Sequence, residues 1–204
     1  VKSLPSKIFS PGPLRWLLAL MFLILLPLAI GESWVSLIVE MMALAILATS
    51  LNILIGYGGM VNFGHAAYYG IGAYTCALLL KKAGVPFLLA MTAAPICSAV
   101  GALIIGWFCV RLSHIYFAML TLAFGMMIHT IIWKWDRLTG GADGLVNIPR
   151  PNLNFLLFQV DLSSISSYYY FTLVLVAIAL YVLWVVVNSH FGLALRAVRE
   201  NSER

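Results

Sequence analysis

The amino-acid sequence predicts an all-α fold: a polytopic transmembrane helical bundle of about six spans with one glycine-rich broken or re-entrant segment. Hydrophobic residues make up 63% of the chain and charged residues only 9%, against roughly 25% in a soluble domain. The apolar residues gather in windows of about 20, the length that crosses a bilayer as a helix. We therefore expect lipid, rather than water, to surround most of this chain.

Six apolar windows follow one another and define the expected spans. The first follows a basic N-terminus and looks like a signal peptide, but no small-x-small cleavage site follows Pro27, so we expect a retained helix. The third is short and begins inside the glycine-rich segment. The windows, in order, are Leu14–Ile30, Trp34–Ile55, His65–Leu80, Phe87–Val110, Ile115–Trp133 and Tyr168–Val187.

The glycine-rich segment, Gly56–Tyr74, contains six of the 16 glycines. Glycine destabilises a helix by about 1 kcal/mol relative to alanine, and irregular backbone is excluded from contact with lipid. The segment is therefore either re-entrant and buried by protein, or a cytoplasmic turn beside a tightly packed helix. Because discontinuous helices line substrate routes in transporters, the candidates for the translocation pathway or for close packing are Asn52, Asn62, Gly64, His65, Gly70 and Gly72.

Two polar residues of this segment have alternative interpretations. His65 is either a proton relay or substrate contact, as intramembrane ionisable groups often are, or a structural histidine that caps the next helix or bonds a free carbonyl; we favour the structural role. Asn62 is expected to cap the helix that follows it, because its side-chain oxygen can accept a bond from a free backbone N–H.

The long polar connection Lys134–Ser167 contains the sequence Thr139-Gly-Gly-Ala-Asp-Gly144, which is turn chemistry rather than helix. One carboxylate among glycines is a weak signal for a cation site. We therefore favour a turn that positions an external loop, and no metal site is expected. The external-loop candidates are Gly140, Gly141, Asp143 and Gly144.

The C-terminal residues 189–204 form a second informative segment. Phe191, Leu195 and Val198 recur at helical spacing and give one apolar stripe, while the charged residues fall elsewhere. The segment is expected to be a short amphipathic helix, which either lies on the membrane surface or docks onto a partner. The chain thus divides into a membrane domain, 1–188, and this helix, 189–204.

Charge and motif content exclude several classes. The net charge of +5 comes from basic residues in loops, where they orient helices rather than bind nucleic acid. A cytoplasmic N-terminus places seven basic residues inside and five outside. The four histidines are scattered, the three cysteines lack metal or disulfide spacing, and no phosphate-binding Gly-x-x-x-x-Gly-Lys-Ser/Thr loop is present. No catalytic residues are expected, and an enzyme is disfavoured.

Seven segments, in the same order, resemble one family. They are Leu51-Asn52, Gly56–Gly59, Phe63–Ala67, Tyr69–Tyr74, Leu120–Phe124, Thr139–Leu145 and Phe191–Arg199. The family they resemble is the inner-membrane permease of branched-chain amino acid ABC importers, the LivM-like branch. Members of this family are longer, so the chain is similar to their N-terminal part, and the helix at 189–204 is expected to continue beyond it.

The resemblance implies a permease that passes substrate from a periplasmic binding protein to the cytoplasm by alternating access, in the bacterial inner membrane. It implies a second homologous permease and two cytoplasmic ATPases, which would bind ATP-Mg, while this chain would bind no cofactor. Urea, short-chain amides and a passive channel stay open as alternatives. The residues it implies for coupling to the ATPases are Phe191, Gly192, Leu195, Arg196, Arg199 and Glu200.

Overall fold

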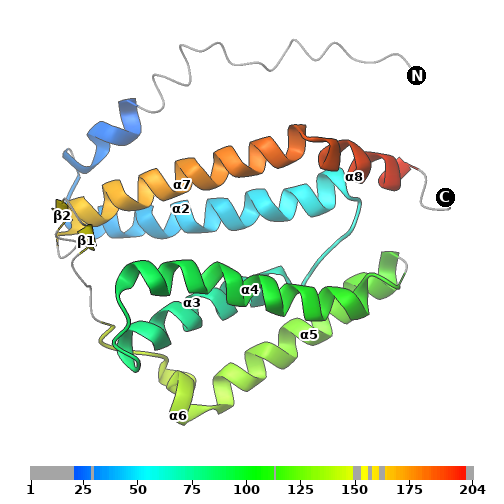
Figure 1. Cartoon of the computed structure of the whole chain (residues 1–204), viewed down its shortest axis with the longest axis horizontal. Coiled ribbons are helices and arrows are strands. Elements are labelled where there is room, and N and C mark those ends of the chain that lie inside the picture. The colour runs from blue at the N-terminus through cyan, green and yellow to red at the C-terminus, as the bar shows by residue number, and fades with distance from the viewer. Residues whose placement is uncertain are drawn as a thin grey trace.

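The computed structural model of the chain describes residues 21–28, 30–112, 114–148, 153–155, 158–160 and 164–200. Almost all of this part is helical, and residues 21–28 form a helix ahead of the numbered elements (Figure 1). The elements are α2 (Glu32–Asn52), the π-helix η2 (Ile53–Tyr57), α3 (His65–Lys81), α4 (Phe87–Cys109), α5 (His114–Lys134), α6 (Asp136–Thr139), the 3-10 helix η3 (Gly141–Asp143), β1 (Leu153–Phe155), β2 (Phe158–Val160), α7 (Ile165–Asn188) and α8 (His190–Glu200).

Within the described residues, four helices are long and apolar enough to cross a membrane. They comprise residues Glu32–Tyr57, Phe87–Cys109, Ile115–Lys134 and Ile165–Asn188. The prediction of about six spans is therefore confirmed only for these four. The third predicted span forms α3, whose 17 residues fall short of a full crossing because the chain before it is irregular. About half of the first predicted span, residues 14–20 and 29, lies outside the described residues, and residues 21–28 of it are helical.

The helices form two groups (Figure 1). In one group α2 packs along α7, with Val35, Met42 and Tyr169 at the centre of their contact. The Tyr169 hydroxyl also donates to the backbone oxygen of Leu23, at 2.6 Å, which ties residues 21–28 to this pair. In the other group α3 packs along α4, and α5 crosses both. Ile105 forms its buried centre with Cys109 and Phe117.

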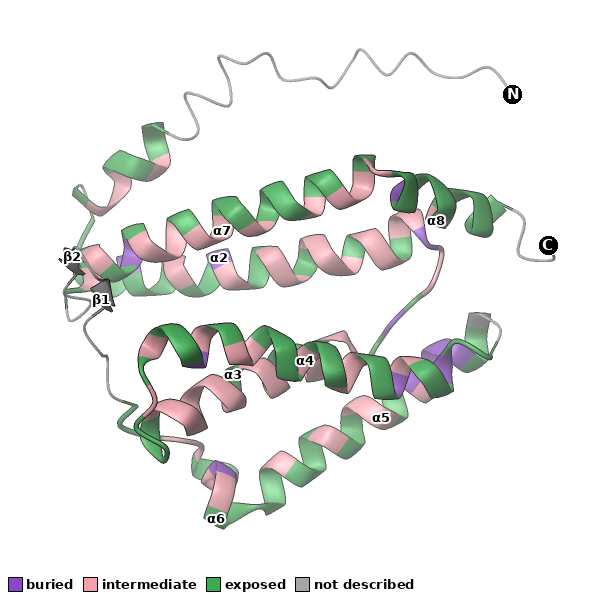
Figure 2. Cartoon of the chain, in the orientation of Figure 1, coloured by how far each residue is buried: buried purple, intermediate pink, exposed green. Residues whose placement is uncertain are grey.

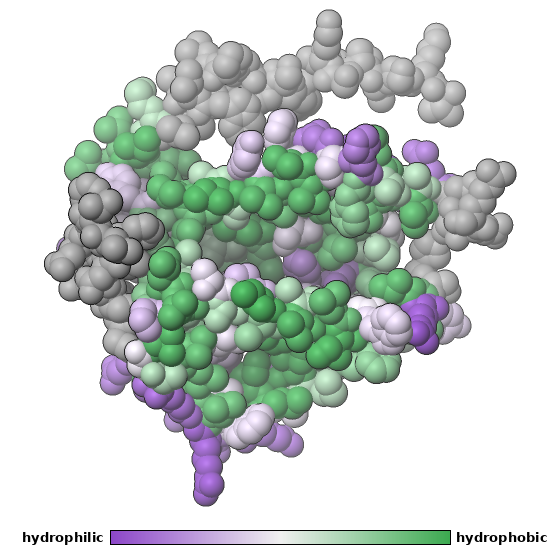
Figure 3. All heavy atoms as spheres, viewed as in Figure 1, coloured by the Kyte–Doolittle hydropathy of each residue, from purple (hydrophilic) through white to green (hydrophobic). Residues whose placement is uncertain are grey.

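Large apolar side chains cover most of the outer faces of these helices. Figure 2 shows few buried positions along the long helices, and Figure 3 shows hydrophobic atoms over most of the visible face. Leu103, Trp107 and Val110 on α4 and its end, for example, are each more than two-thirds exposed. A helix that is apolar on every side requires burial or a lipid environment, so the exposed faces are those of a membrane protein.

The turns alternate between two ends of the molecule, as a set of antiparallel spans requires. α8, η2 and the α4–α5 turn lie at one end, and the α3–α4 turn, α6 and the β1–β2 hairpin lie at the other (Figure 1). The hairpin is antiparallel, with Asn154 opposite Gln159. These strands and the single helical turn of α6 were not expected in the long connection 134–167, where only turns were predicted.

Candidate functional site

The glycine-rich segment begins where α2 changes into the π-helix η2. Gly58 N–H donates to the oxygen of Ile53 at 3.2 Å, and Met60 N–H donates to that of Leu54 at 3.1 Å. After η2 the backbone is irregular, and Gly59 has a φ of 67°, a left-handed conformation that favours glycine. Single π-turns are frequent at functional sites, and this one ends the α2 helix.

Gly64 lies directly against the backbone of α5. A Cβ at this position would overlap the carbonyl oxygen of Thr121, and a Cβ at Gly125 would lie 3.1 Å from the Cα of Gly64. The Phe63 N–H donates to the Thr121 hydroxyl at 3.3 Å. Thr121 is the eighth residue of α5, roughly 10 Å from its start at 1.5 Å per residue. The irregular segment therefore packs against the interior of α5 and not against its end.

Asn62 does not cap α3, so that prediction is wrong. Its side-chain oxygen accepts from the N–H of Gly64 at 2.9 Å, two residues on, which closes a local Asx turn. The residue at the N-cap position is Gly64, which has no side chain to offer. Asn62 is buried, so this turn replaces a cap in shaping the entry to the helix.

His65, the first residue of α3, is tied to α2. Its Nε2 lies 2.7 Å from the hydroxyl of Ser50, and its ring meets that of Tyr68 edge to face. Its Nδ1 is buried and has no hydrogen-bond partner among the described residues. His65 and Ser50 also line a cavity of about 600 Å³ between α2, α3 and α4, next to Gly72. The contact to Ser50 supports a structural role for this histidine.

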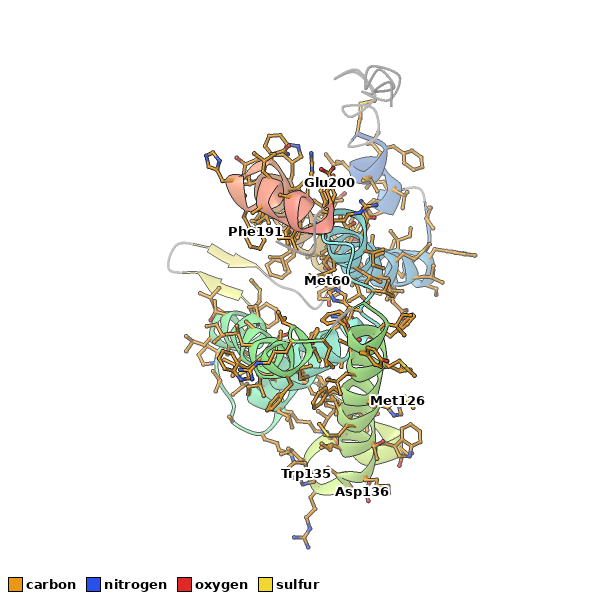
Figure 4. All side chains as sticks on the ribbon, turned by 90° about the vertical axis from the view of Figure 1, so that its right-hand side faces the viewer. Met60, Met126, Trp135, Asp136, Phe191 and Glu200 are labelled. Carbon is orange, nitrogen blue, oxygen red and sulfur yellow. The ribbon has the colours of Figure 1, made fainter. Side chains whose placement is uncertain are left out.

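The helix α8 lies on η2 at the same end of the molecule. Arg199 donates a hydrogen bond to the backbone oxygen of Gly56, and its aliphatic stem occupies the space beside Gly59. The guanidinium of Arg196 stacks over the ring of Tyr57, 4.7 Å from its centre. Figure 4 looks onto this end and shows α8 near Met60 of the irregular segment. Two predicted coupling residues thus contact the glycine-rich segment of their own chain.

Three apolar side chains of α8 are exposed. Phe191, Leu193 and Val198 are each about 60% exposed. Leu193 was not among the predicted coupling residues. Leu195 was among them, but it is half-buried. Glu200 is exposed at the end of the helix (Figure 4). Gly192 is buried, and a Cβ there would overlap the carbonyl oxygen of Val187. Only glycine therefore lets α8 turn sharply out of α7 at this point.

The external-loop candidates form a compact turn at the opposite end. Gly140, Gly141 and Gly144 all have positive φ, and a Cβ on Gly141 would overlap the Asp136 carboxylate. Two lysines at the end of α3 bond to the residues on either side of this turn: Lys81 donates to the oxygen of Val146 and Lys82 to that of Arg137. In the part of the chain described by the structure, no three His, Cys, Asp or Glu side chains are placed to hold a metal.

The remaining pathway candidates are Asn52, Gly70 and Gly72. Asn52 is exposed at the end of α2, with its amide beside Gly56. Gly72 lets α3 approach the backbone of Ala94 on α4, and Gly70 faces α5. Sequence reasoning missed Thr121 and Gly125, on which Gly64 rests, and also Ser50 and Tyr57. An isolated glycine inside an apolar helix often marks close packing, so Gly125 was the signal from which this contact could have been predicted.

Comparisons with known proteins agree with one another. A family model described as the branched-chain amino acid transport system permease component matches residues 33–204. Two curated relatives, both named high-affinity branched-chain amino acid transport system permease protein LivM, come from Salmonella typhimurium and Escherichia coli. Each is 29% identical over 194 residues, an alignment covering 86% of this chain and 46% of the relative. The chain thus spans about half the length of these relatives. No solved structure matches it significantly.

Proposed function

Because the chain belongs to the branched-chain amino acid transport permease family, we propose that it forms the N-terminal part of the permease subunit of an ATP-driven importer for branched-chain amino acids. The names of both LivM relatives support this substrate class. The sequence has no phosphate-binding loop, so ATP-Mg would bind to separate ATPase subunits. A second permease and a periplasmic binding protein would complete the importer.

The contact between α8 and η2 is the observation that carries this proposal. A coupling helix needs one side that docks onto the ATPase and another that transmits movement to the transmembrane helices. The exposed Phe191 and Val198, seven residues apart and so on one face of the helix, offer the first side. Arg196 and Arg199 supply the second, since they hold Tyr57 and Gly56.

A movement of α8 would reach the transmembrane helices through a short series of contacts. From Gly56 the chain runs through the irregular residues to Gly64, which rests on Thr121 of α5. The next residue, His65, begins α3 and is bonded to Ser50 of α2. A displacement of η2 would therefore shift three helices relative to one another, which is the kind of change that alternating access requires.

We place the end that carries α8 in the cytoplasm of a bacterial inner membrane, with the N-terminus on the same side. With this orientation seven of the 12 basic residues of the sequence fall on the cytoplasmic side and five on the other, and the cytoplasmic loops of membrane proteins are enriched in Lys and Arg. With the ends so placed, residues 58–64 enter the membrane region from the cytoplasm. Gly58, Asn62 and Gly64 are buried, and the Phe63 N–H and Gly64 contact Thr121 of α5, so part of this irregular backbone is covered by protein, as the hydrocarbon region requires.

The experiment is purification of the full-length protein from native membranes, followed by mass spectrometry and reconstitution into proteoliposomes. We expect two ATPases and a second permease to copurify, and ATP-dependent uptake of leucine once the binding protein is added. Uptake of urea or acetamide, with none of leucine, would assign a different substrate. Leucine flux without ATP would indicate a passive channel and overturn the proposal.

A further inference from the structure

The cavity of about 600 Å³ beside His65 lies between the two groups of helices, because its walls come from α2 in one group and from α3 and α4 in the other (Figure 1). Leu47 belongs to the α2 wall, Tyr69 to the α3 wall and Ala94 to the α4 wall. Protein interiors are close-packed. We therefore expect this space, which is large enough to take several side chains, to be filled in the assembled protein.

The lining of this cavity differs from the face that α4 turns outward. Small and polar residues of all three helices line the cavity, among them Ala43, Ala73, Ala94, Ser98 and His65. The outer face of α4 instead carries large apolar side chains such as Leu103, which is 74% exposed. Interfaces between transmembrane helices are enriched in small residues, whereas ionisable side chains rarely face lipid. The lining is therefore typical of a surface that another helix covers.

Tyr69 presents a phenol hydroxyl on the α3 wall, and its side chain is 50% exposed. In the part of the chain that the structure describes, this hydroxyl has no hydrogen-bond partner. Tyr57, the last residue of η2, follows Ser50 by seven residues, roughly 10 Å at 1.5 Å per residue. Tyr69 lies one helical turn further inward, since it follows His65, which is bonded to Ser50. Acyl chains at this depth offer no hydrogen-bonding group, and a tyrosine hydroxyl in apolar surroundings usually has a partner, so a protein occupant fits better than lipid.

We propose that this cavity seats a transmembrane helix from the part of the full-length permease that lies outside these 204 residues, and that this helix forms a hydrogen bond with the hydroxyl of Tyr69. The alignment covers 46% of each LivM relative, so a permease of their length has more chain to pack against these helices. α8 lies at the same end as Ser50, since Arg199 contacts Gly56 there. A span that follows α8 can therefore cross beside α2, α3 and α4. This inference rests on the proposed function, in which the chain is one part of a longer permease subunit.

The first test is a photo-crosslink in the full-length permease, assembled with its partners. A diazirine analogue of leucine replaces Leu47, and mass spectrometry identifies the crosslinked peptides; we expect one apolar segment of the same chain outside residues 1–204. The matched control is the same analogue at Leu103, which should not label that segment. Leu103 lies five residues, about 140° around α4, from the lining residue Ser98. Crosslinks from both positions to the same segment, or from Leu47 only to lipid, to the second permease or within residues 1–204, would overturn the proposal.

The second test is Tyr69→Phe, which removes the hydroxyl and keeps the ring. It should lower the midpoint of thermal unfolding of the full-length permease in detergent. Tyr181→Phe on α7 is the control, because that side chain is 65% exposed and lies outside the cavity, so its midpoint should match wild type. Equal midpoints for the two variants would mean that no helix bonds to Tyr69. Failure of the proposed function would instead appear as absent leucine uptake by the wild-type complex, with the crosslink from Leu47 unaffected.

Discussion

The guanidinium of Arg199 donates a hydrogen bond to the backbone oxygen of Gly56, 143 residues earlier in the chain. In a continued α-helix this oxygen would accept from Met60, but Met60 N–H donates to Leu54 instead. Arg199 thus satisfies a carbonyl that the π-turn sets free. Hydrogen bonds that involve a charged group contribute about 1.5–3 kcal/mol, enough to hold α8 against the segment that leads into α3.

Gly64→Ala should destabilise the protein. The added methyl group would overlap the carbonyl oxygen of Thr121, and overpacking of this kind costs about 1–3 kcal/mol. Thermal unfolding of the purified protein in detergent should show a lower midpoint. Gly31→Ala is the control, because a Cβ there meets nothing within 4 Å. Equal midpoints for the two variants would refute the close approach of Gly64 to α5.

Gly192→Ala should displace α8 from η2. Its methyl group would overlap the backbone of Val187 at the sharp turn between α7 and α8. Arg196 and Arg199 would then be freer, so trypsin should cleave after them faster than in the wild type. The same substitution at Gly106, where nothing stands within 4 Å, should leave the cleavage rate unchanged. Wild-type cleavage of Gly192→Ala would mean that the turn tolerates a side chain.

Ser50→Ala should lower stability by about 1–3 kcal/mol, the cost of leaving a buried polar group without a partner. The ring of His65 would then have neither nitrogen bonded, since its Nδ1 is already unpaired among the described residues. Thr130→Ala is the control, because that exposed hydroxyl bonds only within its own helix. If both variants unfold at the same temperature, the Ser50 contact contributes nothing.

Phe191→Glu combined with Val198→Glu should prevent the ATPases from copurifying. These side chains are 61% and 59% exposed on one face of α8, and charge on an apolar docking face is strongly unfavourable. Val146→Glu is the control, since that residue is 64% exposed at the opposite end of the molecule. Retention of the ATPases by the double variant, at a normal level of membrane insertion, would assign docking to another surface.

The long apolar windows predicted the main helices well. The expected starts at Phe87 and His65 coincide with those of α4 and α3. For α4 the reason is its long apolar window, because more than twenty apolar residues leave a chain few alternatives to a helix. The contacts within the candidate site could be predicted less fully from the sequence. The seven motifs located the glycine-rich segment and α8, but periodicity does not encode contacts across 143 residues. Arg196 and Arg199 were therefore expected to face the ATPase, whereas they contact Tyr57 and Gly56.

The central claim is that α8 transmits ATP-driven movement to the glycine-rich segment through Arg199. The most direct measurement is the ratio of leucine taken up to ATP hydrolysed by the reconstituted complex carrying Arg199→Ala. We predict that the ATPases stay bound and active while this ratio falls by about tenfold, the effect of losing roughly 1.4 kcal/mol of coupling. Arg111→Ala, which removes an arginine stacked on Trp107 at the same end, should leave the ratio unchanged. A wild-type ratio in Arg199→Ala would contradict the account.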